Sequence, residues 1–527
     1  MCSLIVDTKE YTKVLIYRMA ESSNKTILKN TVFLYGRTLI LLILGLYTSR
    51  VTMQALGVEN YGIINVVSGF VSMFALISGA LTGACQRFIT YELGKKNGNV
   101  RQVFSSTFYI HAALAIIVVV LAETVGLYFV NHKLNLPHDK MVDALWVFHC
   151  SVISFVLNLI NIPYNALIIA HEKMKAFAYI SLIEAFFKFA IVYTILKLTF
   201  NPLILYAVLG LIASTIVRGI YQYYCVSSFK FEAKVERVKE KQSFKEIFGF
   251  AGWAFIGNSA TLLNGQGINI ILNVFVGVTI NAARGIASMI EGTIMSFVYN
   301  FTTALNPQIT KSYAQRDTNR LSELLDLGTR MSFYLMIVMS VPIILVTPDL
   351  LKLWLTVYPD YSVSFIRITL FIAIVQALSN PYITAICATG HIRNYQLVVG
   401  LITIVNVPVC YVLLMIGLDP IWVYISSLIM YIITFVIRIL FIRSNVHIPV
   451  RILCLTILLR LFPISVLSFM VSYILSLNIN TSTWFGLIEF AIISCVISLI
   501  LIYIIGLRKP ERKLVNCYIT SKVRNKK

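Results

Sequence analysis

Apolar stretches of about 20 residues alternate with short polar segments from residue 28 to residue 507. A helix of roughly 20 apolar residues crosses the hydrocarbon core of a bilayer. The pattern therefore predicts an all-α polytopic membrane protein with about fourteen transmembrane helices. The predicted spans are 28–49, 61–84, 104–130, 144–169, 177–197, 203–225, 248–276, 282–305, 329–347, 362–387, 396–416, 421–442, 453–475 and 484–507.

Composition supports this class and narrows the partners. Hydrophobic residues make up 58% of the 527 positions and charged residues 13%, whereas a soluble domain carries about a quarter charged residues. The formal net charge of +21 lies mainly in short segments between the apolar runs, so it does not indicate a nucleic-acid partner. The expected surroundings are the lipid bilayer.

The positions of lysine and arginine predict the orientation, because cytoplasmic loops of membrane proteins are enriched in both. With the N-terminus inside, 32 of the 44 lysines and arginines fall on the inner side and three on the outer side. Both termini are therefore expected in the cytoplasm. The predicted outer segments are short, which excludes a large extracytoplasmic catalytic domain.

An internal repeat divides the chain. Its two copies are offset by 218–222 residues. Six spans per copy bring both copies into the membrane from the same side, so we expect parallel repeats about an axis along the membrane normal. The matched pairs include Pro163 with Pro381, Tyr164 with Tyr382, His171 with His391, Lys173 with Arg393, Asn158 with Gln376, Gln86 with Gln308, Tyr91 with Tyr313, and Gly57-Val58 with Gly277-Val278.

The repeat and the charge pattern predict six parts of the chain. Residues 226–247 are a charged connector between the lobes, and the last two spans have no partner in the repeat. The parts are a cytoplasmic segment at 1–27, a first lobe at 28–225, the connector at 226–247, a second lobe at 248–442, an appendage at 443–507 and a basic tail at 508–527.

Five of the charged residues inside predicted spans are candidate site residues, because a charge at the centre of a span costs about 2.5–3.5 kcal/mol and needs a reason. Arg37 lies deep in the first span and is a candidate for a cavity, although snorkelling to the inner interface is the alternative. Glu184 and Lys188 are four residues apart and either form a self-contained ion pair or line a wet cavity. Arg284 and Glu291 share one helical face; snorkelling could account for Arg284, which lies near the outer end, but less easily for Glu291.

A polar and small stripe follows the seventh span at Asn258, Thr261, Gly265, Asn269 and Asn273. Such a stripe allows close helix packing with hydrogen bonds across the interface, or it lines a groove. We therefore treat Asn258 and Asn269 as candidate cavity residues.

Pro163 and Pro381 interrupt matched spans. A proline removes a backbone donor and bends a helix, so each either fixes a kink or serves as a hinge. Their recurrence in the repeat favours the hinge as a hypothesis.

Motifs of catalysis and of metal binding are missing from the sequence. No HExxH, P-loop, GxGxxG or GxSxG pattern occurs, and the nine cysteines show no CxxC spacing. We therefore expect neither catalytic residues nor a metal or cofactor, and the chain is predicted not to be an enzyme.

Several motifs in order resemble the bacterial polysaccharide flippases of the O-antigen and capsule type, in the multidrug/oligosaccharidyl-lipid/polysaccharide exporter superfamily. The resemblance covers nearly the whole chain. The motifs are Asn30-Thr31, Gly57-Val58-Glu59-Asn60-Tyr61-Gly62, Pro163-Tyr164-Asn165-Ala166, Asn306-Pro307-Gln308 and Tyr313.

The resemblance implies two six-helix lobes forming a V-shaped bundle in the bacterial cytoplasmic (inner) membrane, with two further C-terminal helices. Its substrate would be an undecaprenyl-diphosphate-linked oligosaccharide, flipped to the periplasmic leaflet by alternating access, and its partners would include membrane proteins of glycan assembly. Arg37, Lys188 and Arg284 would attract the anionic head group. Glu184 and Glu291 would supply counter-charges or couple transport to H⁺ or Na⁺.

Two other functions stay open at this point. A cation-coupled multidrug exporter of the same superfamily would favour a more acidic and aromatic cavity. A membrane glycan polymerase or ligase would need a sizeable outer loop bearing arginine or histidine, and the predicted outer loops are short and nearly uncharged.

Overall fold

The structure is a computed structural model of the chain. It describes residues 26–27, 29–45, 47–48, 51–52, 55–56, 60, 63–64, 67, 71, 74–132, 138–198, 200–238, 241–276, 278–355, 358–446, 457–509, 511–512 and 516. These residues form helices and connecting turns and contain no β-strand, which confirms the predicted all-α class.

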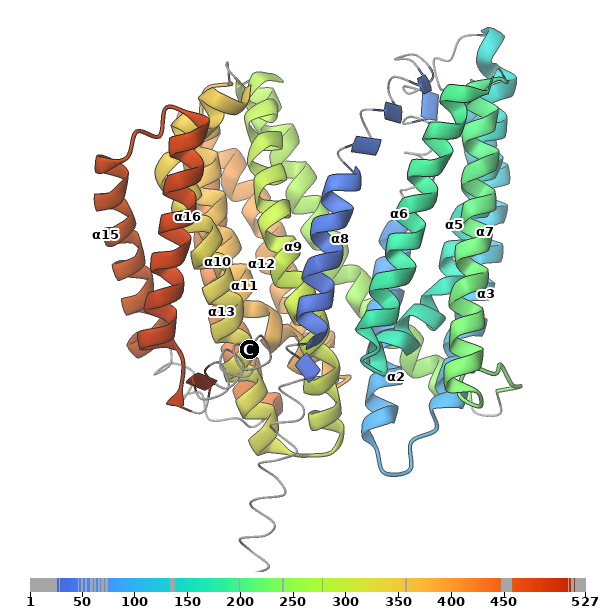
Figure 1. Cartoon of the computed structure of the whole chain (residues 1–527). Coiled ribbons are helices and arrows are strands. Elements are labelled where there is room, and N and C mark those ends of the chain that lie inside the picture. Colours follow the sequence, from blue (N-terminus) through green and yellow to red (C-terminus); the bar gives the residue numbers. More distant parts are fainter. Residues whose placement is uncertain are drawn as a thin grey trace, which may run out of the picture. The chain divides into compact units, whose positions relative to one another are not determined.

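Long helices make up most of the described chain (Figure 1). The first described helical stretch, residues 29–45, precedes the labelled helices. The helices are α2 (Ala75–Gly94), α3 (Val100–Leu121), α4 (Leu127–His132), α5 (Met141–Ala170), α6 (Met174–Lys197), α7 (Pro202–Phe229), α8 (Lys241–Val276), α9 (Val278–Ala314), α10 (Thr318–Leu355), α11 (Ser362–Ala388), α12 (Arg393–Met415), α13 (Ile421–Phe441), α15 (Phe462–Asn478) and α16 (Trp484–Leu501).

Eleven helices in the described part of the chain are long and apolar enough to cross a membrane. They agree in order with eleven of the fourteen predicted spans. The predicted spans 28–49 and 61–84 include residues outside the described set. The predicted span 282–305 lies within α9, which is not among the eleven because polar residues and glycines interrupt its apolar run.

The chain divides into two compact units, each described separately below. The first unit comprises Met1–Ser259, Thr303–Arg320 and Gly390–Gln396, and the second comprises Ala260–Thr302, Leu321–Thr389 and Leu397–Lys527. The end of α9 and the start of α12 therefore belong to the first unit. The predicted lobe boundaries remain a prediction.

In the first unit α5 packs against α2, α3 and α7, and α6 packs against α7 (Figure 1). The core of this packing includes the buried Phe148 and Val147 of α5 and Ala207 of α7. Asn201 caps α7, since its side chain accepts a hydrogen bond from the Leu203 amide at 3.0 Å. These helices form the frame of the site described below.

In the second unit α11 packs against α13, and α15 packs against α16. Two buried serine pairs join α15 to α16, with Oγ–Oγ distances of 2.5 Å for Ser468–Ser498 and 2.7 Å for Ser472–Ser494. Small hydroxyl residues allow close approach of membrane helices and hydrogen-bond across them. Phe490 of α16 is fully buried in a cluster with Val346 of α10, so the two C-terminal helices pack on α10.

A buried group of charges lies at the start of α10. The Arg330 side chain is 1% exposed, and its Nε donates to Asp326 Oδ2 at 2.8 Å. Its two terminal nitrogens donate to Glu511 at 3.0 and 2.6 Å. Because Glu511 follows the last helix, these bonds fix the chain beyond α16 to α10.

Candidate functional site

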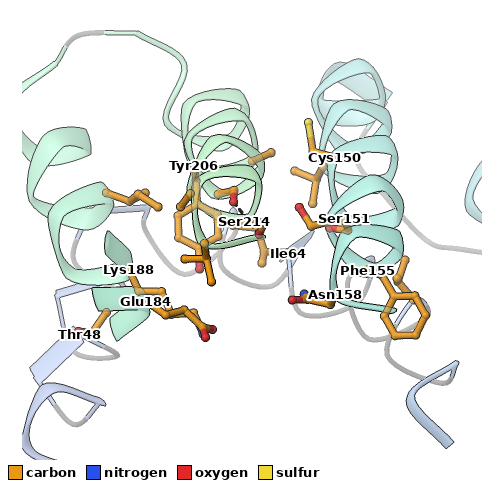
Figure 2. Close-up of a pocket in the computed structure, with 18 residues that line it drawn as sticks. Thr48, Ile64, Cys150, Ser151, Phe155, Asn158, Glu184, Lys188, Tyr206 and Ser214 are labelled. Carbon is orange, nitrogen blue, oxygen red and sulfur yellow. Dashed lines mark hydrogen bonds and ion pairs between the residues drawn. The ribbon is translucent and has the colours of Figure 1, made fainter. Parts of the chain in front are cut away.

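The first unit contains a cavity of about 400 Å³ among α5, α6 and α7, which we name the first cavity (Figure 2). This volume lies in the range of pockets for small organic ligands. Its polar lining residues are Thr48, Ser151, Ser154, Asn158, Glu184, Lys188, Tyr206 and Ser214.

Glu184 and Lys188 form one wall of the first cavity, from α6. Lys188 Nζ donates to Glu184 Oε1 at 2.8 Å, and their side chains are 66% and 44% exposed. The spacing of four residues places both on one face of α6. The two alternatives raised by the sequence therefore coexist, because this ion pair also lines a cavity.

Arg37, from the helical stretch 29–45, lies near this wall but is not among the described residues that line the first cavity. Its guanidinium carbon lies 4.5 Å from the centroid of the Phe177 ring, in a cation–π contact. Glu184 and Tyr221 lie within electrostatic reach of Arg37. Glu184 is therefore an anion with two cationic neighbours, Arg37 and Lys188.

The wall opposite Glu184 carries neutral polar groups (Figure 2). Ser151, Ser154 and Asn158 follow the helical spacing of three and four residues on α5, so they share one face. Ser214 of α7 donates to the Gly210 carbonyl at 2.9 Å, which leaves its oxygen lone pairs available as acceptors. The first cavity thus combines hydroxyl, amide and paired charged groups.

The second unit contains a smaller cavity of about 210 Å³ lined by α8, α9, α11 and α13, which we name the second cavity. Arg284 and Glu291, both from α9, line it. Arg284 Nη2 donates to the Gly265 carbonyl of α8 at 3.1 Å. Arg284 and Glu291 lie within electrostatic reach of each other.

The polar stripe on α8 reaches the second cavity only in part. Thr261 and Gly265 line it, whereas Asn258 and Asn269 are not among its described lining residues. Asn269 Nδ2 instead donates to Gln266 Oε1 at 3.2 Å. Asn264 of α8, which the stripe pattern did not include, also lines the cavity and is 8% exposed.

A buried hydrogen-bond network lies behind the second cavity. Asn406 of α12 is 1% exposed, and its Nδ2 donates to Asn264 Oδ1 at 3.2 Å and to Ser427 Oγ at 3.0 Å. Ser426 Oγ donates to Asn406 Oδ1 at 2.8 Å. The sequence signal for this network was an asparagine in the middle of the apolar run 396–416.

The two cavities are built from equivalent positions of the repeat. Asn158 lines the first cavity and its repeat partner Gln376 lines the second. With the same offset of 218 residues, Ser151 corresponds to Thr369, which also lines the second cavity. Thus α5 and α11 present the same face to their cavities.

The charges of the second cavity have apolar equivalents in the first. Residues Ile64 and Val71 line the first cavity and correspond to Arg284 and Glu291 at the offset of 220 residues that relates Gly57 to Gly277. Charge therefore comes from α6 in the first cavity and from α9 in the second.

Pro163 and Pro381 lie inside α5 and α11, and both are buried. Each helix continues on both sides of its proline. Each proline lies five residues after a cavity residue of the same helix: Pro163 follows Asn158, and Pro381 follows Gln376. Their role as hinges remains a hypothesis.

Comparison with known proteins gives the family. The chain matches the family described as "Polysaccharide biosynthesis protein" over residues 27–313 and the family described as "MatE" over residues 259–412. The first match covers more than half of the chain. The chain belongs to the polysaccharide biosynthesis protein family.

One curated relative is similar to part of the chain. The chain is 18% identical over 296 residues to the "Uncharacterized membrane protein EpsK" of Bacillus subtilis (strain 168). That alignment spans 56% of this chain and 58% of EpsK, less than two thirds of the relative's length.

Two solved structures show the fold. One is an outward-facing multidrug resistance MATE family transporter of the MOP superfamily, at a TM-score of 0.67 and 12% identity, covering 81% of this chain and 96% of that one. The other is a MOP superfamily transporter from Pyrococcus furiosus, described as having a binding pocket of reverse polarity. Its TM-score is 0.65 and its identity 12%, and the match covers 79% of this chain and 96% of that one. The fold is therefore that of these two membrane transporters.

Proposed function

We propose that this protein flips an undecaprenyl-diphosphate-linked oligosaccharide from the cytoplasmic to the periplasmic leaflet of the bacterial inner membrane by alternating access. The observation that carries the proposal is the first cavity, whose hydroxyl, amide and paired charged groups lie in a chain of the polysaccharide biosynthesis protein family. In this proposal both termini of the protein lie in the cytoplasm, which agrees with the distribution of lysine and arginine along the chain.

The chemistry of the first cavity suits a sugar head group. Serine hydroxyls and the Asn158 amide both donate and accept hydrogen bonds, as sugar hydroxyls do. The sugar and diphosphate enter this polar space while the lipid tail stays in the bilayer, which avoids the cost of burying polar groups in hydrocarbon. Arg37 and Lys188 attract the diphosphate, and Glu184 limits how tightly they hold it.

The second cavity is assigned to coupling in this proposal. Glu291 is the acidic residue of its described lining, and Arg284 lies within electrostatic reach of it. Binding of H⁺ or Na⁺ at Glu291 would favour one state of the transporter only if its affinity differs between the two states. A volume of about 210 Å³ leaves room for an ion with water but little for a glycan.

A flipping assay tests the substrate. Proteoliposomes carry the purified protein and a fluorescent undecaprenyl-diphosphate-linked oligosaccharide, and an impermeant quencher reports its transfer between leaflets. We expect transfer with the protein and about tenfold slower transfer for Lys188→Met, which corresponds to about 1.4 kcal/mol. Lys197→Met, nine residues along the same helix and stacked over Tyr193, is the control that should transfer normally.

A cellular experiment separates the proposal from a drug exporter. A deletion strain should accumulate lipid-linked oligosaccharide on the cytoplasmic face and lose surface glycan, with unchanged sensitivity to cationic drugs. If the Arg37→Ala variant is expressed normally in this strain and restores surface glycan, Arg37 is not needed for flipping. Increased drug sensitivity with normal surface glycan would contradict the flippase and favour the exporter.

A further inference from the structure

The turn between α5 and α6 holds a carboxylate whose two oxygens each accept a hydrogen bond. Glu172 lies in the left-handed region at φ 60°, and its side chain is 10% exposed. Lys311 Nζ donates to its Oε1 at 2.6 Å, and Gln308 Nε2 donates to its Oε2 at 2.5 Å. Asn30 Nδ2 donates to the Glu172 carbonyl at 3.1 Å. Hence one turn of the first repeat is bonded to the end of α9, which comes from the second repeat.

The surrounding packing brings α2 and α9 together at the same end. A Cβ placed on Gly94 would lie 2.7 Å from Ala314 Cβ, so only glycine permits this approach. The rings of Tyr91 and Tyr313 lie 6.4 Å apart. These two tyrosines are partners in the repeat, so equivalent positions of the two copies lie side by side at this end of the first unit.

The Glu172 bonds have no counterpart at the equivalent positions of the repeat. The repeat partner of Glu172 is Ile392, and that of Lys311 is Ile89 at the offset found for Tyr91 and Tyr313. Ile392 is 1% exposed and Ile89 is fully buried. The equivalent positions are therefore buried and apolar, and the charged contact is found in only one copy of the repeat.

We propose that Glu172, Lys311 and Gln308 form a latch that holds the ends of the two repeats together in one state of the transporter and opens when the first cavity is exposed to the side where lysine and arginine predominate. These are positioning residues and do not contact substrate. The inference rests on the proposed alternating access, but not on the identity of the substrate.

The energetics of a nearly buried ion pair suit a latch. Removing one partner leaves the other charge buried and uncompensated. Opening, in contrast, transfers both charges to water together, and exposed pairs contribute little to stability. The contact therefore biases the equilibrium between the states without making opening prohibitively slow. The apolar Ile89 and Ile392 at the equivalent positions could not be exposed to water in this way without exposing hydrophobic surface.

Accessibility of the first cavity tests the latch without any substrate. A cysteine at Ser154, on the α5 wall, is labelled with an impermeant maleimide added to inside-out vesicles. We expect Glu172→Gln and Lys311→Met to raise the labelling rate at least fivefold. The exchanged pair Glu172→Lys with Lys311→Glu should return it to within twofold of the parent, because the attraction between the two positions is restored. A merely structural role would change thermal unfolding without changing the labelling rate.

The matched control is Glu232→Gln. Glu232 pairs with His171 at 2.6 Å on the same turn, but it belongs to the connector and not to α9. Its labelling rate should equal that of the parent. Unchanged labelling in Glu172→Gln and Lys311→Met would overturn the latch, as would failure of the exchanged pair to rescue while it folds normally by thermal unfolding.

The two proposals fail in different ways. If labelling rises in Glu172→Gln and Lys311→Met but the parent protein transfers no lipid-linked oligosaccharide, the latch is supported and the proposed substrate is wrong. Normal transfer with unchanged labelling keeps the substrate and overturns the latch.

Discussion

The first and second cavities occupy equivalent places in the two copies of the repeat, yet they differ in size and in the origin of their charge. Each uses one face of a matched helix, with Asn158 on α5 and Gln376 on α11. The first is about twice as large, at about 400 against 210 Å³. Duplication preserved the neutral walls, and the charged residues diverged.

The difference also concerns what lies behind each wall. The charges of the first cavity are exposed and neutralise each other within α6. In the second cavity Arg284 bonds to a backbone carbonyl, and the buried Asn406 network supports the adjacent wall. A wide site with exposed groups can adapt to a glycan, whereas a small supported site holds its groups in fixed positions. The two cavities are thus suited to different ligands.

The largest expected effect on stability is in the wall of the second cavity. Asn406→Leu removes the partners of Asn264, Ser426 and Ser427 and should lower the free energy of unfolding by about 1–3 kcal/mol, because buried polar groups lose their hydrogen bonds. Thermal unfolding in detergent measures this. Asn158→Leu, exposed in the first cavity, is the control and should unfold at nearly the parent temperature.

A second experiment concerns the two carboxylates. Glu291→Gln should abolish the dependence of transfer on a H⁺ or Na⁺ gradient, because the second cavity loses its negative charge. Glu184→Gln should keep that dependence while slowing transfer about tenfold, or about 1.4 kcal/mol. Transfer measured with and without each gradient distinguishes them. The comparison of the cavities would be wrong if the gradient dependence followed Glu184.

A smaller effect is expected when the ion pair of the first cavity is inverted. Glu184→Lys with Lys188→Glu should change the free energy of unfolding by less than about 1 kcal/mol, since both side chains are well exposed. Transfer should be slower than in the parent, because the lysine at position 184 would lie within electrostatic reach of Arg37. Normal transfer would show that only the pair matters, and that its position relative to Arg37 does not.

The smallest effect distinguishes the neutral walls. Asn158→Ala should slow transfer by two- to fivefold, the loss of roughly 0.5–1 kcal/mol from one hydrogen bond. Gln376 is the repeat partner of Asn158. Gln376→Ala should leave the transfer rate of a neutral glycan unchanged when the H⁺ or Na⁺ gradient is saturating. Equal losses in both variants would indicate that the glycan contacts both cavities.

The sequence predicted the features that depend on long patterns. The apolar runs located the eleven observed spans, and the repeat related positions that prove equivalent in the two cavities. It also selected Glu184, Lys188, Arg284 and Glu291, all of which line cavities, because a charge inside a span needs a reason.

The spacing of two charged residues along a helix could not distinguish a buried ion pair from an exposed one. Asp326 and Arg330 have the same spacing of four residues as Glu184 and Lys188, but they are 3% and 1% exposed. Their role depends on Glu511, which lies 181 residues further along the chain from Arg330. Likewise Asn264 and Asn269 of α8 are the same residue type five positions apart, and the hydrogen bond from Asn406 of α12 distinguishes Asn264. Contacts of this range are not visible in a periodicity.

The bonds of Glu172 also have a consequence for biosynthesis. The first unit includes Thr303–Arg320 and Gly390–Gln396, so it is not complete when the first six spans leave the ribosome. Until Gln308 and Lys311 are made, the Glu172 carboxylate has neither of its side-chain donors and remains hydrated. Insertion into the membrane therefore follows the order of the spans, whereas assembly of the first unit waits for segments synthesised much later.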